Sequence, residues 1–172
     1  NLFTQFASDP SQVSRTVNFL NALLSAGCIL FLFWSITRLV RSLLKEEKEN
    51  LSVTDVIIIL GSGLVGALAY TFSDTFWFSA VEGEVYAFSS FLTALVFWMI
   101  LRWQDESDTV YGDRWIILIA YIIGLSIGVH LLNLLCIPAI VLVFYYQKYR
   151  TISLKGAIAA IALSGLLIVL IL

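Results

Sequence analysis

The sequence has little charge, little proline and almost no histidine. Only 13% of its 172 residues are Asp, Glu, Lys or Arg, and it contains two prolines and one histidine. Soluble domains carry about a quarter charged residues, so this composition excludes an ordinary soluble fold. The net charge of −2, without a basic stripe, gives no reason to expect a nucleic-acid partner.

Cysteine is also scarce. Cys28 and Cys136 both lie within apolar runs, where a small buried side chain is a better interpretation than a disulfide or a metal ligand. One histidine and two cysteines in separate segments make a zinc site unexpected. Any dependence on a divalent metal stays open.

What the sequence does have is apolar length, because 60% of its residues are hydrophobic. A membrane-spanning helix needs about 20 mostly apolar residues. The pattern therefore predicts an all-α fold, a polytopic transmembrane helix bundle in a single domain over residues 1–172. The chain begins without methionine and stops inside an apolar run, so we expect it to be a fragment of a longer protein. About six spans are predicted, over residues 17–44, 56–72, 86–101, 115–129, 131–146 and 156–172.

The apolar stretch from Trp115 to Tyr146 is the ambiguous part of this pattern. As one helix it would be about 48 Å long, far more than a bilayer core requires. As two short spans that turn near Gly128–Asn133, it places nine of the ten basic residues in cytoplasmic loops and only Arg15 outside. The distribution of basic residues therefore favours a hairpin.

This topology places residues 1–14, Ser73–Gly83 and the turn near His130 on the outer side. Two pairs of small residues predict close helix contacts, because such spacing lets helix backbones approach one another in lipid. The pairs are Ser62 with Gly66 and Gly124 with Gly128.

The segment from Ser73 to Tyr86 gathers carboxylates and aromatic rings at the predicted outer surface. Glu82 and Glu84 are candidate catalytic residues, because carboxylates there can act as a general base or bind a polar substrate. Asp74, Trp77 and Tyr86 are candidate substrate-binding residues, since aromatic rings stack on sugar faces.

A structural interpretation of the same segment stands beside the functional one. Ser79 and Glu82 have the spacing of a capping box, so Glu82 could close the N-terminus of the third span. Trp77 and Tyr86 could belong to the aromatic belt of a membrane interface, and Asp74 could cap a turn. Glu82 and Glu84 would point in different directions on a helix, unless Gly83 keeps the chain extended.

His130 and Asn133 lie together at the predicted outer turn of the hairpin. His130 could bind a phosphate or act as an acid–base group, or it could satisfy backbone carbonyls where the helices break. Asn133 shares both interpretations.

Two stretches, Ser73–Phe88 and Gly124–Asn133, resemble a bacterial membrane family known as a domain of unknown function. That family is related to protein O-mannosyltransferases and belongs to the GT-C glycosyltransferase superfamily. The resemblance implies an enzyme of the bacterial inner membrane with its site at the periplasmic face, a polyprenyl-phosphate sugar as donor, and a protein or glycan acceptor. It also implies that these spans match the second to the seventh of a GT-C core, with the principal catalytic aspartate before Asn1. Glu82 and Glu84 would then be its partners, and His130 would lie near the lipid phosphate.

Two other functions compete with this one, a transporter fragment and a structural membrane subunit. A transporter predicts ionisable residues along a path through the spans. The spans hold few, with Arg38 and Asp55 near the predicted cytoplasmic edge. A structural subunit predicts that the acidic–aromatic segment faces a partner and forms no cavity.

Overall fold

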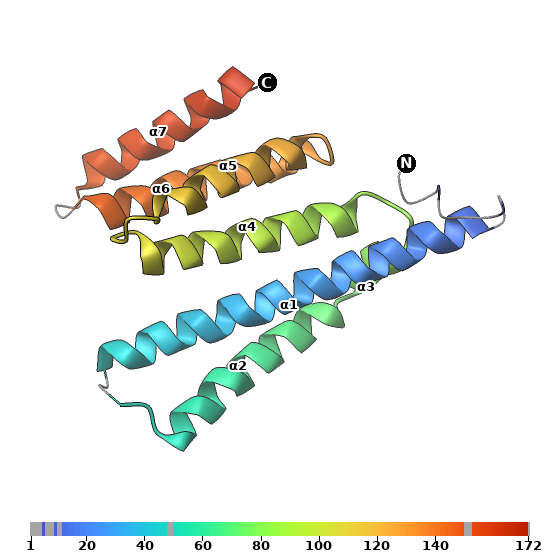
Figure 1. Ribbon diagram of the computed structural model, residues 1–172, viewed down its shortest axis with the longest axis horizontal. Coiled ribbons are helices and arrows are strands. Elements are labelled where there is room, and N and C mark those ends of the chain that lie inside the picture. Colours follow the sequence, from blue (N-terminus) through green and yellow to red (C-terminus); the bar gives the residue numbers. More distant parts are fainter. Residues whose placement is uncertain (1–4, 6–8, 10–11, 48–49, 150–152, 172) are drawn as a thin grey trace. The chain divides into compact units, whose positions relative to one another are not determined.

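A computed structural model describes residues 5, 9, 12–47, 50–149 and 153–171, except the side chains of residues 46, 47 and 132. Over these residues all regular structure is helical (Figure 1), which confirms the predicted all-α class. The elements are α1 (Val13–Glu47), α2 (Val53–Thr71), α3 (Asp74–Val81), α4 (Tyr86–Glu106), α5 (Asp113–Ile127), the 3₁₀ helix η3 (Leu131–Leu135), α6 (Cys136–Lys148) and α7 (Leu154–Ile171).

Four of these helices, α1, α2, α4 and α7, are long and apolar enough to cross a membrane. The chain is therefore a multi-pass membrane protein. The other two predicted spans correspond to α5 and α6, which have 15 and 13 residues. Both are shorter than the ~20 residues of a typical span, so the predicted total of six crossings stays a prediction.

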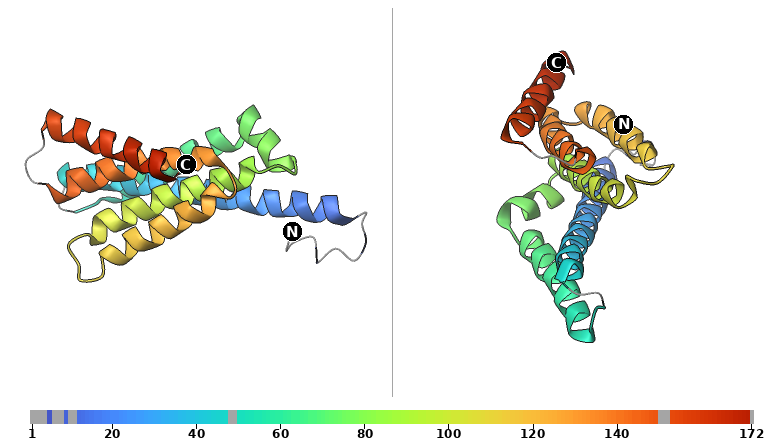
Figure 2. Two further views of the ribbon diagram at one scale, coloured as in Figure 1. Left: turned by 90° about the horizontal axis from the view of Figure 1, so that it is seen from above. Right: turned by 90° about the vertical axis from the view of Figure 1, so that its left-hand side faces the viewer.

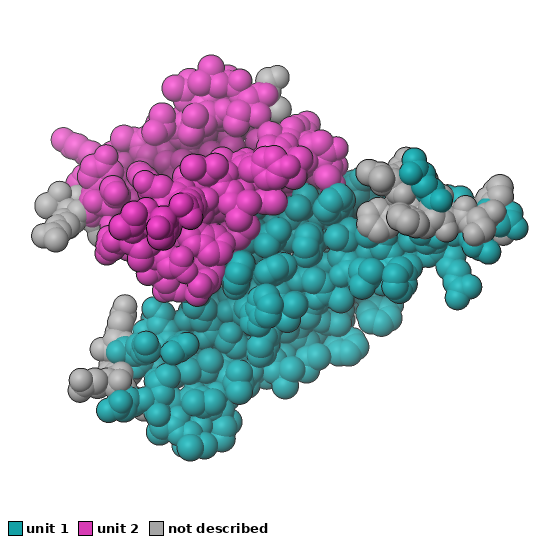
Figure 3. Space-filling view, in the orientation of Figure 1, with its two compact units in different colours: residues 1–98 teal, residues 99–172 magenta. Residues whose placement is uncertain are grey.

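The chain divides into two compact units, residues 1–98 and 99–172 (Figure 3). The boundary falls within α4.

In the first unit, α2 packs along the C-terminal half of α1. A methyl group added at Gly66 would lie 2.5 Å from Ile36 Cδ1, and one added at Gly63 would collide with Thr37 and the Phe33 ring. The predicted close contact at Gly66 is thus confirmed, and Gly63 is a second point of approach that the prediction missed.

The N-terminus of α2 carries a capping box. Asp55 N donates to Ser52 Oγ at 3.3 Å, and Asp55 Oδ2 accepts from Ser52 N at 2.8 Å and from Ser52 Oγ at 2.7 Å. The Asp55 side chain is buried. Since a buried carboxylate needs hydrogen-bond donors, this pairing gives Asp55 a structural role at the start of the helix.

The segment between α2 and α4, expected to be an external loop, contains the short helix α3. Ser73 precedes α3, and Phe76 is the residue that α3 buries. The ring of Phe76 lies 4.5 Å from that of Tyr70 at the end of α2. This contact joins α3 to the end of α2, and α3 also packs on α1.

The first turns of α4 pack on α1. Phe31 of α1 contacts the rings of Phe91 and Trp98, with centroid distances of 5.8 and 5.3 Å. Cys28 is buried, and its Sγ donates to Ser90 O at 3.4 Å. Cys28 is therefore the small core residue that the sequence predicts.

In the second unit, the chain breaks and reverses between α5 and α6 (Figures 1 and 2). Helix α5 ends at Ile127, and Val129 N and His130 N both donate to Ser126 O. Near the C-terminus of α6, Gln147 Nε2 donates to Ser107 Oγ in the turn before α5, at 2.8 Å. The predicted turn near Gly128–Asn133 is present.

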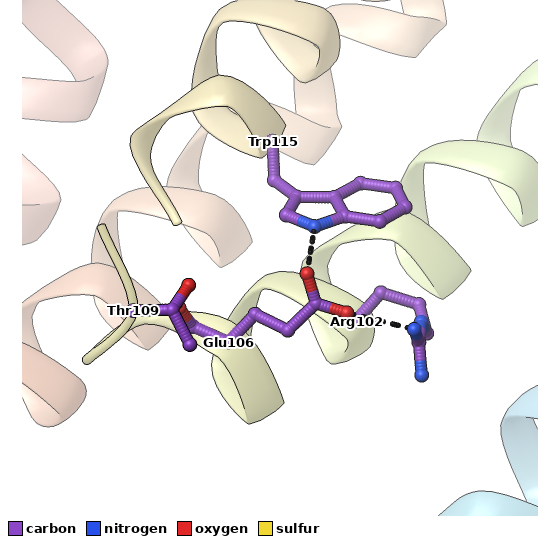
Figure 4. A network of polar contacts seen from close by, with 4 residues as sticks. All are labelled: Arg102, Glu106, Thr109 and Trp115. Atoms are coloured by element: carbon purple, nitrogen blue, oxygen red, sulfur yellow. Dashed lines mark hydrogen bonds and ion pairs between the residues drawn. The ribbon is translucent and has the colours of Figure 1, made fainter. Parts of the chain in front are cut away.

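The turn from α4 to α5 is held by Glu106 (Figure 4). Its Oε1 accepts from Arg102 Nη2 at 2.7 Å and its Oε2 accepts from Trp115 Nε1 at 2.8 Å. Its carbonyl accepts from Thr109 Oγ1 at 2.7 Å. One carboxylate thus joins the last turn of α4 to the first turn of α5.

A cavity of about 360 Å³ lies among α5, α6 and α7, lined almost wholly by aliphatic side chains. Gly124 borders this cavity, and a methyl group added there would meet nothing within 4 Å. The close helix contact predicted at Gly124 is therefore not formed within the described part of the second unit, because open space lies on that face of α5.

Candidate functional site

The first unit contains a pocket of about 490 Å³ where α2, α3 and the start of α4 meet. Its lining combines aromatic rings, hydroxyl groups and one carboxylate. Such a lining suits a ligand with several hydroxyl groups and an apolar face, because rings cover the face while polar groups fix its orientation. The lining residues are Tyr70, Thr75, Phe76, Phe78, Ser79, Glu82, Tyr86 and Ser90.

Glu82 reaches this pocket because helix α3 ends directly before it. Glu82 has extended backbone angles, φ −88° and ψ 141°, and its N–H donates to Phe78 O at 3.0 Å. Ser79 lies inside α3, where its Oγ donates to Thr75 O at 3.0 Å. The predicted capping box of Ser79 and Glu82 is therefore wrong: Glu82 follows the C-terminus of α3 and does not cap the N-terminus of α4.

The chain from Glu82 to Val85 is not helical, and α1 holds it by its backbone. The Asn21 side chain, which is buried, donates through Nδ2 to Glu82 O and to Glu84 O, the latter at 3.1 Å. A methyl group at Gly83 would lie 3.3 Å from both Asn18 and Val17. We call residues 82–85 the acidic loop.

The structure separates the predicted residues of this unit into two groups. Glu82 and Tyr86 line the pocket together. Glu84, Asp74 and Trp77 are exposed and are not among its lining residues. The Trp77 ring is stacked on Phe72, with 6.3 Å between centroids, an arrangement that fits an interfacial aromatic belt.

His130 and Asn133 belong to the second unit. His130 is half-buried just after α5, and its N–H donates to Ser126 O at 2.9 Å. Asn133 is buried; its backbone N–H donates to His130 O at 3.2 Å, and its Nδ2 lies 3.5 Å from Ser126 O. That these two residues share a cavity with Glu82 stays a prediction.

Sequence reasoning missed most of the pocket lining, including Tyr70, Phe76 and Ser90. One signal was available for Tyr70, because it stands at the end of an apolar span on the predicted outer side. Ser90 gives no such signal, since it reaches the pocket only through the packing of α4 beside α2. For Asn21 the sequence gives no signal beyond a polar residue near the start of an apolar span.

No group of three His, Cys, Asp or Glu side chains that could hold a metal ion occurs among the described residues. The pocket itself offers a single carboxylate, Glu82. The lining residues can therefore form hydrogen bonds, stack on a ligand and transfer a proton.

The pocket and the basic residues of α1 lie toward opposite ends of that helix. Asn21 contacts the acidic loop, whereas Arg38, Arg41 and Lys45 are in the C-terminal part. At about 1.5 Å per residue, Asn21 and Arg38 are about 26 Å apart along the axis, close to the thickness of a bilayer core. The assignment of the two ends to opposite membrane faces stays a prediction.

Comparison with curated proteins and with solved structures found no match. Residues 1–153 match the family described as protein O-mannosyl-transferase TMEM260 N-terminal domain. The match includes the whole pocket, the acidic loop and the turn at His130, and it confirms the predicted relation to protein O-mannosyltransferases. The chain belongs to the family of the protein O-mannosyl-transferase TMEM260 N-terminal domain.

Proposed function

We propose that this chain is part of a membrane glycosyltransferase that transfers a sugar, mannose in the first instance, from a polyprenyl-phosphate donor to a protein hydroxyl group. The observation that carries the proposal is the family match over residues 1–153. The pocket supports it, because its rings and hydroxyl groups surround the carboxylate of Glu82.

The reaction is a displacement at the anomeric carbon of the donor sugar. A carboxylate takes the proton from the acceptor hydroxyl, whose oxygen forms the new bond to the anomeric carbon. The bond from that carbon to the phosphate oxygen breaks, and the polyprenyl phosphate leaves with the electron pair. Hydrogen-bond donors aimed at the departing phosphate stabilise its charge.

In the first unit, Glu82 is the carboxylate best placed to take the proton from the acceptor hydroxyl. It accepts a hydrogen bond or a proton from a hydroxyl group in the pocket, while Tyr86 and Phe78 cover the face of the sugar. Glu84 adds a second negative charge beside Glu82, outside the pocket. For His130 and Asn133, which belong to the second unit, we propose binding of the donor phosphate.

The proposed location is the periplasmic face of a bacterial inner membrane. It is supported by the basic residues at one end of α1 and the acidic loop at the other. A lipid-linked donor also explains why the pocket is formed at the end of membrane helices, since the phosphate lies at the bilayer surface while the polyprenyl tail stays in it. A structural subunit is less well supported, because it predicts no cavity at the acidic–aromatic segment.

The class of donor tests this proposal. The complete protein, purified into lipid nanodiscs, is given a serine- and threonine-containing peptide with radiolabelled mannose on either polyprenyl phosphate or a nucleotide diphosphate. The proposal predicts labelled peptide from the lipid donor and background counts from the nucleotide donor. Transfer from the nucleotide donor alone, or from neither donor, would refute it.

A further inference from the structure

The acidic loop is held by two backbone hydrogen bonds, from Glu82 N to Phe78 O at 3.0 Å and from Glu84 N to Glu82 O at 2.9 Å, and by a side chain of α1. Asn21 of α1 is only 4% exposed, and its Nδ2 directs hydrogen bonds to Glu82 O and Glu84 O across more than sixty residues of sequence. A carboxamide nitrogen has two protons. Asn21 therefore uses both on the two carbonyls that flank Gly83.

This arrangement decides where the two carboxylates point. Glu82 O belongs to the peptide plane between Glu82 and Gly83, and Glu84 O belongs to the plane between Glu84 and Val85. The two hydrogen bonds therefore restrain the backbone on both sides of Gly83, and with it the directions in which the two glutamate side chains leave the loop. Glu82 lines the pocket and Glu84 does not. Gly83 fits closely against α1, since a Cβ there would lie 3.3 Å from Asn18 Oδ1 and Val17 Cγ1.

The contact continues along one face of α1. Ser25, one turn after Asn21, is buried, and Cys28, almost one further turn on, donates through Sγ to Ser90 O at 3.4 Å. Ser90 also lines the pocket. The face of α1 that begins with Asn21 thus supports both the acidic loop and the start of α4.

We propose that Asn21 is a positioning residue for the acidic loop: its two hydrogen bonds hold Glu82 in the pocket and Glu84 out of it. Asn21 is not among the residues that line the pocket, so it acts only through the loop backbone. The kinetic part of this inference rests on the proposed glycosyltransfer, whereas the mechanical part does not.

The test compares Asn21→Asp with Asn18→Asp in the complete protein. Both changes add one negative charge to α1 near the loop, but only Asn21→Asp replaces a donor of two hydrogen bonds by a carboxylate that faces two carbonyl oxygens. The readout is the hydrogen–deuterium exchange rate of the backbone amides of residues 82–85, measured on the protein in nanodiscs. We expect exchange at least about ten times faster in Asn21→Asp than in the wild type, and no more than about twofold faster in Asn18→Asp.

The kinetic readout uses the same variants with the polyprenyl-phosphate mannose donor. A displaced carboxylate should reduce kcat by about 10- to 100-fold and change KM for the donor by less than about threefold. Asn21→Gln keeps the two donor protons, so it should recover part of kcat and slow the loop exchange again. If Asn21→Asp is not inserted in the membrane, Asn21→Ser takes its place, because a serine hydroxyl has one proton and cannot bond both carbonyls.

Two results would overturn the inference. One is loop exchange in Asn21→Asp, or in Asn21→Ser when Asn21→Asp is lost, that equals the wild-type rate. The other is equal loss of kcat in Asn18→Asp and Asn21→Asp, which would mean that charge near the loop and not the hydrogen bonds matters. An inactive wild type with faster loop exchange in Asn21→Asp would refute the proposed function and leave the role of Asn21 in place.

Discussion

At the scale of single residues, two glutamates that are nearly adjacent in sequence have different surroundings. Both are exposed, but Glu82 lines a pocket with aromatic and hydroxyl side chains and Glu84 does not. The sequence indicated both as candidates, because carboxylates beside Trp77 and Tyr86 suit a sugar site. It could not separate them, since the separation depends on Asn21, which is distant in sequence and recognisable only from the packing of α1.

The difference predicts unequal effects of the same substitution. Glu82→Gln keeps the shape of the side chain and removes its charge and its ability to take a proton. We expect transfer of mannose to fall by about 100-fold or more, with normal abundance in the membrane. Glu84→Gln is the matched control and should retain activity within about fivefold. Equal losses in the two variants, or none in Glu82→Gln, would show that the pocket does not select Glu82.

At the scale of helices, apolar length and the positions of basic residues were sufficient to locate α1, α2, α4 and α7 and the break at His130. These features depend on local sequence, because a span must be about 20 apolar residues long. Helix α3 was missed, since its eight residues are too few to show a helical period. The capping box of Ser52 and Asp55 was also missed, although its spacing is visible in the sequence.

The contact between α1 and α2 predicts the effect of a single methyl group. Gly63→Ala places a Cβ against Thr37 and Phe33, whereas Gly61→Ala places one in open space. We expect Gly63→Ala to lower the free energy of unfolding by about 1–3 kcal/mol, as overpacking does. Gly61→Ala should be neutral or slightly stabilising, because alanine favours a helix. Thermal unfolding in detergent measures both, and equal midpoints would contradict the close packing at Gly63.

The turn between α4 and α5 gives a second prediction at this scale. Glu106→Gln removes the charge partner of Arg102 and leaves the indole N–H of Trp115 without its carboxylate acceptor. The Arg102 pair is partly exposed and contributes little. The single amide oxygen of Gln can accept from Arg102 or from Trp115 but not from both, so we expect a loss of about 1 kcal/mol. Limited proteolysis at residues 107–112 should be faster than in the control Asp108→Asn. Identical cleavage rates would show that Glu106 does not hold the turn.

At the scale of the whole molecule, the account requires that the pocket end and the basic end of α1 face opposite sides of a membrane. Asp74 and Lys45 are exposed and lie near these two ends. In a background without native cysteines, an impermeant thiol reagent added outside intact cells should label Asp74→Cys and leave Lys45→Cys unlabelled until the cells are opened. The reverse pattern would invert the topology, and labelling of both from outside would exclude a span between them.

The central claim, that a pocket bearing Glu82 transfers sugar on the outer face, is tested most directly in sealed vesicles. The complete protein is reconstituted with radiolabelled polyprenyl-phosphate mannose, and the vesicles in which Asp74 faces outward are isolated. An impermeant acceptor peptide is then added outside, and incorporated label is measured for the wild type and for Glu82→Gln. The account predicts labelled peptide with the wild type and at least about a 100-fold lower rate with Glu82→Gln. Labelling only when the peptide is enclosed within these vesicles, or equal rates for the two proteins, would contradict it.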